Sequence, residues 1–254
     1  MNDFLQIVLP KKAYALLWWQ KNILIRSLMN WIAVLFGVIL GGAVTIVGVQ
    51  LKRQLASRYA LDRPCSHALR TLPLVIAAIV CCAITPILYA RLGANPRSAV
   101  SLIACAMLLC AAIVDAELNL LPDVITLPLA CLAFLASYLF EFQPIAQAIV
   151  GAAVGWGVVE VPNAVARIMG KQECIGRGDA KLMAALGGLL GATAVVTIML
   201  VGCAAILAIA LPYRRAGRGG RFVPFGPALC LAAVLSLCVW PYDLLDWVPL
   251  LWGR

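Results

Sequence analysis

Two aspartates are the residues of this chain whose surroundings most suggest chemistry. Only 11 of the 254 residues are acidic, and Asp115 closes the apolar run Leu108–Val114. A carboxylate in such a run is costly unless it has a partner or a function, and no Lys or Arg stands between Arg97 and Arg167. Taken alone, Asp115 fits a functional carboxylate and a helix end at interfacial water equally well.

The second aspartate follows a glycine-rich turn, Gly176-Arg177-Gly178-Asp179-Ala180-Lys181. Glycines before an aspartate permit tight backbone geometry and the close approach of another segment, although a simple helix cap would also fit. The stronger evidence is the pairing with Asp115, because both aspartates are predicted at the cytoplasmic ends of apolar spans. Two carboxylates that share a site, one protonated and one ionised, can activate water against an amide.

The predicted helix ends suggest different roles for the two aspartates. Asp179 precedes a helix, whose N-terminal end carries partial positive charge, whereas Asp115 ends a helix, where the partial charge is negative. Both effects favour ionised Asp179 and protonated Asp115, so we expect Asp179 to be the general base and Asp115 the acid. Lys181 is expected to hold either Asp179 or a lipid phosphate.

The elements that must position these residues are membrane helices. The chain is 64% hydrophobic and 12% charged, with a mean hydropathy of +0.99, whereas soluble domains are about 45–50% apolar and about 25% charged. We therefore predict an all-α integral membrane protein surrounded by lipid. The net charge of +9 then reports orientation through basic cytoplasmic loops rather than binding to nucleic acid.

About eight apolar stretches approach the ~20 residues that a helix needs to cross hydrocarbon, which predicts a polytopic bundle. The sixth is short and glycine-rich and can merge with the seventh as a hairpin. The predicted spans are Trp31–Val49, Leu72–Tyr89, Ala99–Asp115, Val124–Phe140, Ala146–Val161, Ala180–Leu190, Ala192–Leu211 and Phe225–Trp240.

Four parts of the chain are expected on this basis. Residues 1–27 form an interfacial N-terminal segment, residues 28–71 a first transmembrane helix with a short basic cytoplasmic loop, residues 72–241 a catalytic membrane domain, and residues 242–254 a tail. Most Lys and Arg residues fall on one side when the loops after the odd-numbered spans are placed in the cytoplasm.

The ten cysteines do not form a metal-binding or disulfide pattern. Most lie inside predicted spans, where cysteine behaves as a small apolar residue. The chain has no C-x-x-C pair and a single histidine, His67. We therefore predict no metal site and no cofactor.

Three segments resemble, in order, the motifs of the type IV prepilin peptidases, the bacterial leader peptidases of pilins and pseudopilins. Asp115–Leu129 resembles their first aspartate motif, and Gly176–Lys181 with the helix after it resembles their G-x-G-D-x-K motif. Val223–Pro227 is similar to their late P-F-G-P loop. The resemblance covers roughly Leu72–Trp240.

This resemblance implies that Asp115 and Asp179 are a metal-independent catalytic pair. It implies that the substrates are prepilin or pseudopilin precursors, in which a short basic leader precedes an apolar helix, and that cleavage occurs at the cytoplasmic face of the bacterial inner membrane. Five further residues are expected to shape the site or contact the substrate: Gly176, Gly178, Lys181, Pro122 and Asp123.

Three features qualify the resemblance. Asp123 by its position alone stabilises the first turn of a helix beginning near Pro122 and need not be catalytic. Family members that also methylate the new N-terminus usually carry two C-x-x-C pairs, whereas the loop Gln50–Thr71 holds only Cys65. Cys174 stands where a glycine is usual. We expect peptidase activity without methyl transfer.

Two alternatives stay open at the level of sequence. A noncatalytic assembly or transport subunit would use intramembrane carboxylates such as Asp115 and Glu160 along a proton or ion path. Neither an inverted repeat nor a pair of broken helices is evident, which disfavours a transporter. The second alternative is a degenerate peptidase that binds precursors without cutting them.

Overall fold

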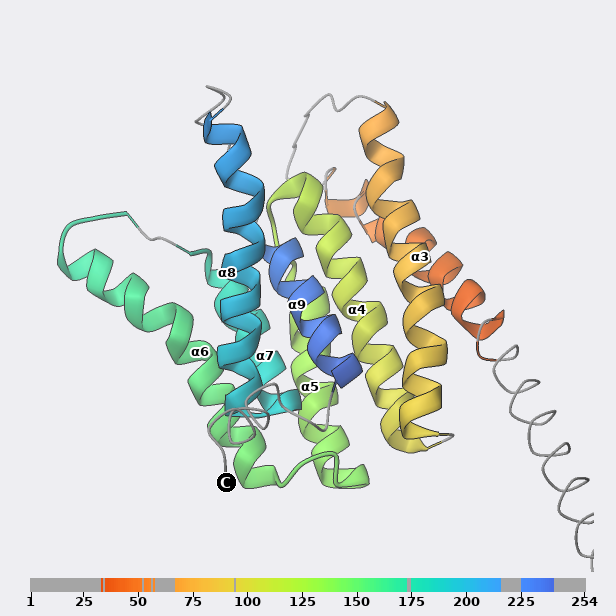
Figure 1. The fold of residues 1–254 in the computed structure, drawn as a ribbon. Helices are drawn as coiled ribbons and strands as arrows, with labels where there is room; N and C mark the ends of the chain where they lie inside the picture. The colour runs from red at the N-terminus through yellow and green to blue at the C-terminus, as the bar shows by residue number, and fades with distance from the viewer. Residues whose placement is uncertain are drawn as a thin grey trace, which may run out of the picture.

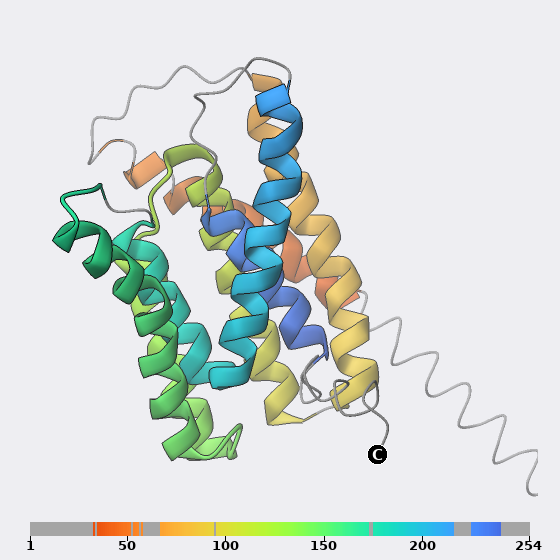
Figure 2. The same cartoon turned by 60° about the vertical axis from the view of Figure 1, so that its left-hand side comes forward.

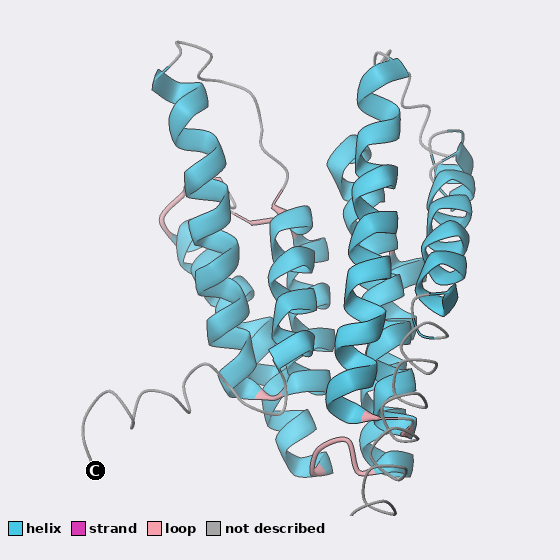
Figure 3. Ribbon diagram, turned by 45° about the vertical axis from the view of Figure 1, so that its right-hand side comes forward, coloured by secondary structure: helices cyan, strands magenta, loops and turns pink. Residues whose placement is uncertain are grey.

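The computed structural model describes residues 33, 35–51, 53–55, 57, 67–93, 95–172, 175–215 and 225–239. These residues form helices and loops without a strand (Figure 3). A helical span, Leu35–Leu55, comes before the labelled helices of Figure 1. The labelled helices are α3 (His67–Leu92), α4 (Pro96–Leu118), α5 (Asp123–Phe140), α6 (Ile145–Ile168), α7 (Arg177–Leu190), α8 (Ala192–Arg215) and α9 (Gly226–Val239).

Several of these helices are suited to lipid by length, composition and exposed surface. Within the described residues, four helices are long and apolar enough to cross a membrane: Leu35–Leu55, Pro96–Ala116, Asp123–Phe140 and Ile145–Ile168. Large apolar side chains also point outward from the bundle, among them Ile39, Leu139 and Leu200. The chain is therefore an all-α polytopic membrane protein, as predicted.

Each of the eight predicted spans overlaps a helix of the described residues. The predicted fourth span and α5 both end at Phe140, whereas α4 continues three residues beyond Asp115 to Leu118. The predicted segments 1–27 and 242–254 lie outside the described residues, as do Cys65 and Cys174.

α7 is an inner helix of the bundle, and most of its residues are buried. It packs between α5 and α6, while α9 packs between α4 and α8, and α3 covers the outer side of α4 (Figures 1 and 2). Fully buried leucines from these inner helices form the core, including Leu108 of α4, Leu186 of α7 and Leu229 of α9. The C-terminal end of α4 and the N-terminal ends of α5, α7 and α9 lie toward one end of the bundle (Figure 1).

Glycines allow α6 and α7 to approach closely. A Cβ built on Gly155 of α6 would stand 2.6 Å from the carbonyl carbon of Met183, and one on Gly151 would stand 2.8 Å from the carbonyl carbon of Gly187. Small residues at such contacts let helix backbones pack against each other in lipid. This contact determines where α7, and the aspartate at its start, lies.

A single residue, Gly191, separates α7 from α8. Its φ of +91° is in the region that favours glycine, and α8 turns back alongside α7 (Figure 2). The sixth and seventh predicted spans therefore form a hairpin of two helices.

Candidate active site

Asp115 lies in the last turn of α4 and is 6% exposed. The helix ends because Asn119 adopts a left-handed conformation, with φ 50°, and its backbone N–H donates to the carbonyl of Asp115 over 2.9 Å. Asparagine tolerates this conformation at helix C-termini better than most residues. The chain then leaves α4 through a short loop to Pro122, which precedes α5.

The first residue of α9, Gly226, lies against the carboxylate of Asp115. The backbone N–H of Gly226 donates a hydrogen bond to that carboxylate, and a Cβ built on Gly226 would stand 2.8 Å from Asp115 Cγ. Only glycine lets the backbone come so near. The N-terminal end of α9 also brings unpaired N–H groups and partial positive charge.

This contact overturns the premise from which we assigned the two roles. We expected a helix N-terminus beside Asp179 alone, and the structure places one beside Asp115 as well. Helix ends therefore do not distinguish the general base from the acid.

Asp179 is the third residue of α7 and is 8% exposed. The residue before the helix, Gly176, donates its backbone N–H to the Asp179 carboxylate. The Asp179 backbone N–H in turn donates to the carbonyl of Gly176 over 3.1 Å. A carboxylate at this helical position commonly reaches back to the capping residue and stabilises the first turn. Asp179 therefore lies inside the first turn of α7, and the capping position is occupied by Gly176.

The fold brings Asp115 and Asp179 close together. As a consequence, their two carboxylates repel each other. Leu121, in the loop between α4 and α5, joins the segments that carry them. A Cβ on Gly178 would stand 2.9 Å from Leu121 Cβ, and one on Gly226 would stand 3.1 Å from Leu121 Cδ1. Three segments far apart in sequence therefore meet around two buried carboxylates.

The partner of Lys181 is Asp123, which neither of our two sequence-based alternatives named. Lys181 Nζ lies 2.6 Å from Asp123 Oδ1, and both side chains are about half exposed. Such an exposed ion pair stabilises a fold by about 0–1 kcal/mol. Pro122 caps α5 and Asp123 opens it, as predicted, so this pair links the starts of α5 and α7.

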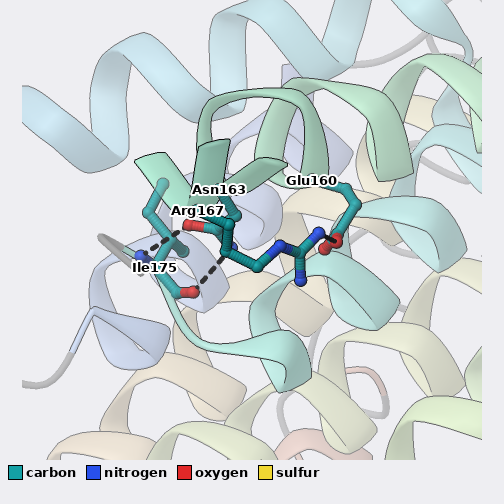
Figure 4. A network of polar contacts seen from close by, with 4 residues as sticks. All are labelled: Glu160, Asn163, Arg167 and Ile175. Carbon is teal, nitrogen blue, oxygen red and sulfur yellow. Dashed lines mark hydrogen bonds and ion pairs between the residues drawn. The ribbon is translucent and has the colours of Figure 1, made fainter. Parts of the chain in front are cut away.

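Asn163 is a fully buried polar residue near the C-terminal end of α6. Its Nδ2 donates to the carbonyl of Ile175 over 2.8 Å, and its Oδ1 accepts from the backbone N–H of Ile175 over 3.2 Å (Figure 4). An amide buried among apolar helices is costly unless both of its ends are bonded. Asn163 therefore holds the chain at the residue directly before Gly176.

Glu160, the other acidic residue inside a predicted span, has a cation partner. Its Oε1 lies 2.5 Å from Arg167 Nη2, on the same helix (Figure 4). A carboxylate within an apolar helix is costly unless it has such a partner. Among the described residues, no group of three or more His, Cys, Asp or Glu side chains could hold a metal ion.

Comparison with known proteins finds similarity over the part of the chain that holds both aspartates. The model of the type IV leader peptidase family matches residues 102–211, a segment that contains both aspartates. A prepilin leader peptidase/N-methyltransferase of Dickeya chrysanthemi is 36% identical over 128 residues, which cover 50% of this chain and 45% of the relative. Proteins of the same name from Neisseria gonorrhoeae and Pseudomonas aeruginosa are 35% and 32% identical, over 52% and 58% of this chain and 45% and 47% of their own.

Residues 102–211 belong to the type IV leader peptidase family. The chain spans about half the length of the curated relatives that it matches. No solved structure matches it. The family segment contains the α4–α5 loop and the start of α7, whereas Gly226 lies beyond it.

Three residues of this candidate site had no role in the sequence-based prediction. Gly226 stood inside the P-F-G-P segment, of which Val223 and Pro224 lie outside the described residues, but its neighbour was unknown. Asn163 carried a usable signal, because a polar amide within an apolar stretch calls for a partner. Leu121 carried none, since its place between two glycines depends on packing.

Proposed function

We propose that this protein is a membrane aspartic endopeptidase that removes the short basic leader from type IV prepilin or pseudopilin precursors. The observation that carries the proposal is the meeting of two buried carboxylates, Asp115 and Asp179, from separate helices. The relatives are named prepilin leader peptidases, and the family segment contains both aspartates.

The chemistry follows from two carboxylates that share one proton. The ionised carboxylate takes a proton from a water molecule held between the pair, and the resulting oxygen attacks the scissile carbonyl carbon. The protonated carboxylate polarises the carbonyl oxygen and transfers its proton as the tetrahedral intermediate forms. The intermediate then collapses: the leaving amine takes a proton from the carboxylic acid, and a hydroxyl of the intermediate gives its proton to the other carboxylate as the carboxyl product forms, which restores one proton to the pair.

The surroundings of each aspartate favour this chemistry. Both side chains are largely withdrawn from solvent, and electrostatic interactions are stronger where water is excluded. Each carboxylate also accepts a backbone N–H, from Gly226 for Asp115 and from Gly176 for Asp179. These two donors hold the carboxylates in place without adding a neutralising side chain to the pair.

The proposed orientation places the aspartates at the cytoplasmic face of a bacterial inner membrane. An apolar substrate helix would lie in the bilayer, with its leader junction beside the two carboxylates. Basic loops on the cytoplasmic side are the main support for this topology. Nucleic acid has no part in the proposal.

Coexpression with a candidate prepilin in cells that lack another leader peptidase tests the proposal. The expected result is a leader-free product, recognised by its mass and its new N-terminus. A failure to process any of several prepilins, while the protein is inserted in the membrane, would favour a protein that binds precursors without cutting them.

We further propose that methyl transfer is absent from this chain. The relatives are named both as peptidases and as N-methyltransferases. The loop Gln50–Thr71 lacks the two C-x-x-C pairs expected for the second activity.

A further inference from the structure

The peptide bond between Ile175 and Gly176 has a different partner on each side. Its carbonyl oxygen, on Ile175, accepts a hydrogen bond from Asn163 Nδ2 over 2.8 Å. Its N–H, on Gly176, donates to the carboxylate of Asp179. One peptide unit therefore connects a buried amide of α6 with a carboxylate of α7.

The planarity of the peptide unit makes this connection rigid. The atoms of a peptide bond lie close to one plane, and in the trans form the C=O and N–H bonds point in opposite directions. Fixing the direction of the Ile175 carbonyl therefore fixes the direction of the Gly176 N–H. A hydrogen bond accepted by a carbonyl also polarises the N–H of the same unit and strengthens it as a donor.

The second hydrogen bond of Asn163 prevents this peptide from rotating freely. Asn163 Oδ1 accepts a hydrogen bond from the backbone N–H of Ile175. The side-chain amide of Asn163 therefore bonds both the N–H and the carbonyl of Ile175 (Figure 4). Glycine at position 176 can adopt more backbone conformations than any other residue. The hydrogen bonds of Asn163 to Ile175 therefore restrict the backbone at a point where it would otherwise vary most.

We propose that Asn163 is a positioning residue, which acts through the Ile175–Gly176 peptide to orient the Asp179 carboxylate. It need not touch the substrate. This proposal rests on the proposed function of Asp179, but the contact itself can be tested without any substrate.

Gln143 provides a matched control at the other end of α7. It is also a buried amide from outside α7, and its Nε2 donates to the carbonyl of Gly188. It borders a cavity of about 630 Å³ lined in part by Leu190 and Thr193, away from the start of α7. A role limited to stability predicts similar effects for Asn163→Leu and Gln143→Leu.

The activity test compares both variants on a prepilin that the wild-type protein cleaves, with rates expressed per folded molecule. We expect Asn163→Leu to lower kcat about 10- to 100-fold with KM within about twofold, and Gln143→Leu to leave both within about twofold. Asn163→Asp keeps the size and the acceptor oxygen but in its ionised form lacks the donor to Ile175. It serves as the second variant if the Leu variant does not accumulate, with the same expected loss of kcat.

Two measurements report on the contact when no prepilin is cleaved. Hydrogen exchange at the Ile175 amide should be faster in Asn163→Leu than in wild type, and unchanged in Gln143→Leu. The infrared carboxyl bands that disappear in Asp179→Asn should shift in Asn163→Leu only. If Asn163→Leu keeps wild-type kcat and unshifted bands, the positioning role is wrong. If the bands shift but the wild-type protein cleaves no precursor, the proposed function fails and the contact stands.

Discussion

The backbone N–H of Gly226 donates to the carboxylate of Asp115, so α9 begins where α4 ends. A Cβ at position 226 would stand 2.8 Å from Asp115 Cγ. The space between this backbone and the carboxylate therefore has no room for a side chain. The glycine is thus required by a carboxylate on another helix.

Gly226→Ala should impair processing without preventing membrane insertion. The added methyl must displace the Asp115 carboxylate or the start of α9, and a misplacement of about 1 Å near a reacting group can cost about a hundredfold in rate. Processing of a coexpressed prepilin, normalised to the inserted protein, measures the effect. Gly157→Ala is the control, since a Cβ there meets no atom within 4 Å. Wild-type processing by Gly226→Ala would show that the backbone contact is dispensable.

Asp115→Asn and Asp179→Asn should each abolish leader cleavage while leaving the protein in the membrane. A pair with one carboxylate cannot both take and give protons, and loss of such acid–base catalysis costs about a hundredfold or more. The measurement is the ratio of precursor to mature prepilin in cells.

Asp123→Asn is the comparison for these variants. Its partner is the exposed Lys181, and loss of such a pair costs about 0–1 kcal/mol of stability, so processing should change far less. If Asp123→Asn were the only inactive variant, the first catalytic aspartate would be Asp123 rather than Asp115.

Gly155→Ala should destabilise the packing of α6 against α7. The new Cβ would stand 2.6 Å from the backbone carbonyl carbon of Met183, and overpacking of this kind typically costs about 1–3 kcal/mol. Unfolding of the purified protein in detergent measures the difference. Gly157→Ala, two residues along the same helix, should be neutral or slightly stabilising because alanine favours helix. Equal stability of the two variants would contradict the close approach of α6 and α7.

The mature product should carry a free, unmethylated N-terminus in cells whose only prepilin peptidase is this chain. The reason is the absence of a C-x-x-C pair from the sequence. Mass spectrometry of the processed prepilin distinguishes the two products by the mass of one methyl group. A methylated product would mean that transfer does not need the cysteine pairs.

Much of the fold was predictable because composition and helix length act locally. Apolar runs indicated each predicted span, including the short one that forms α7, and Pro122 with Asp123 indicated the start of α5. The two aspartates were also found from sequence, since carboxylates beside apolar runs are rare and costly.

The partners of these residues were not predictable, because they depend on which helix ends meet after packing. Lys181 pairs with Asp123, whereas the sequence suggested Asp179 or a lipid phosphate as its partner. Asn163 forms both hydrogen bonds to Ile175 only because the chain returns after α6 so that α7 packs against it. The position of Asn163 in the sequence indicates only that its amide needs hydrogen-bond partners.

Composition and apolar spans were enough to identify a helical membrane protein with two unusual aspartates, whereas the environment of each aspartate depends on how the helices pack. Sequence placed Asp115 at the end of its own helix, and it lies in the last turn of α4, so a negative partial charge was expected there. Packing added the N-terminal end of α9, through Gly226, and a helix end from a distant segment acts on a carboxylate as strongly as the end of its own helix. Electrostatic environment depends on distance in space, and only the packing of the helices sets that distance.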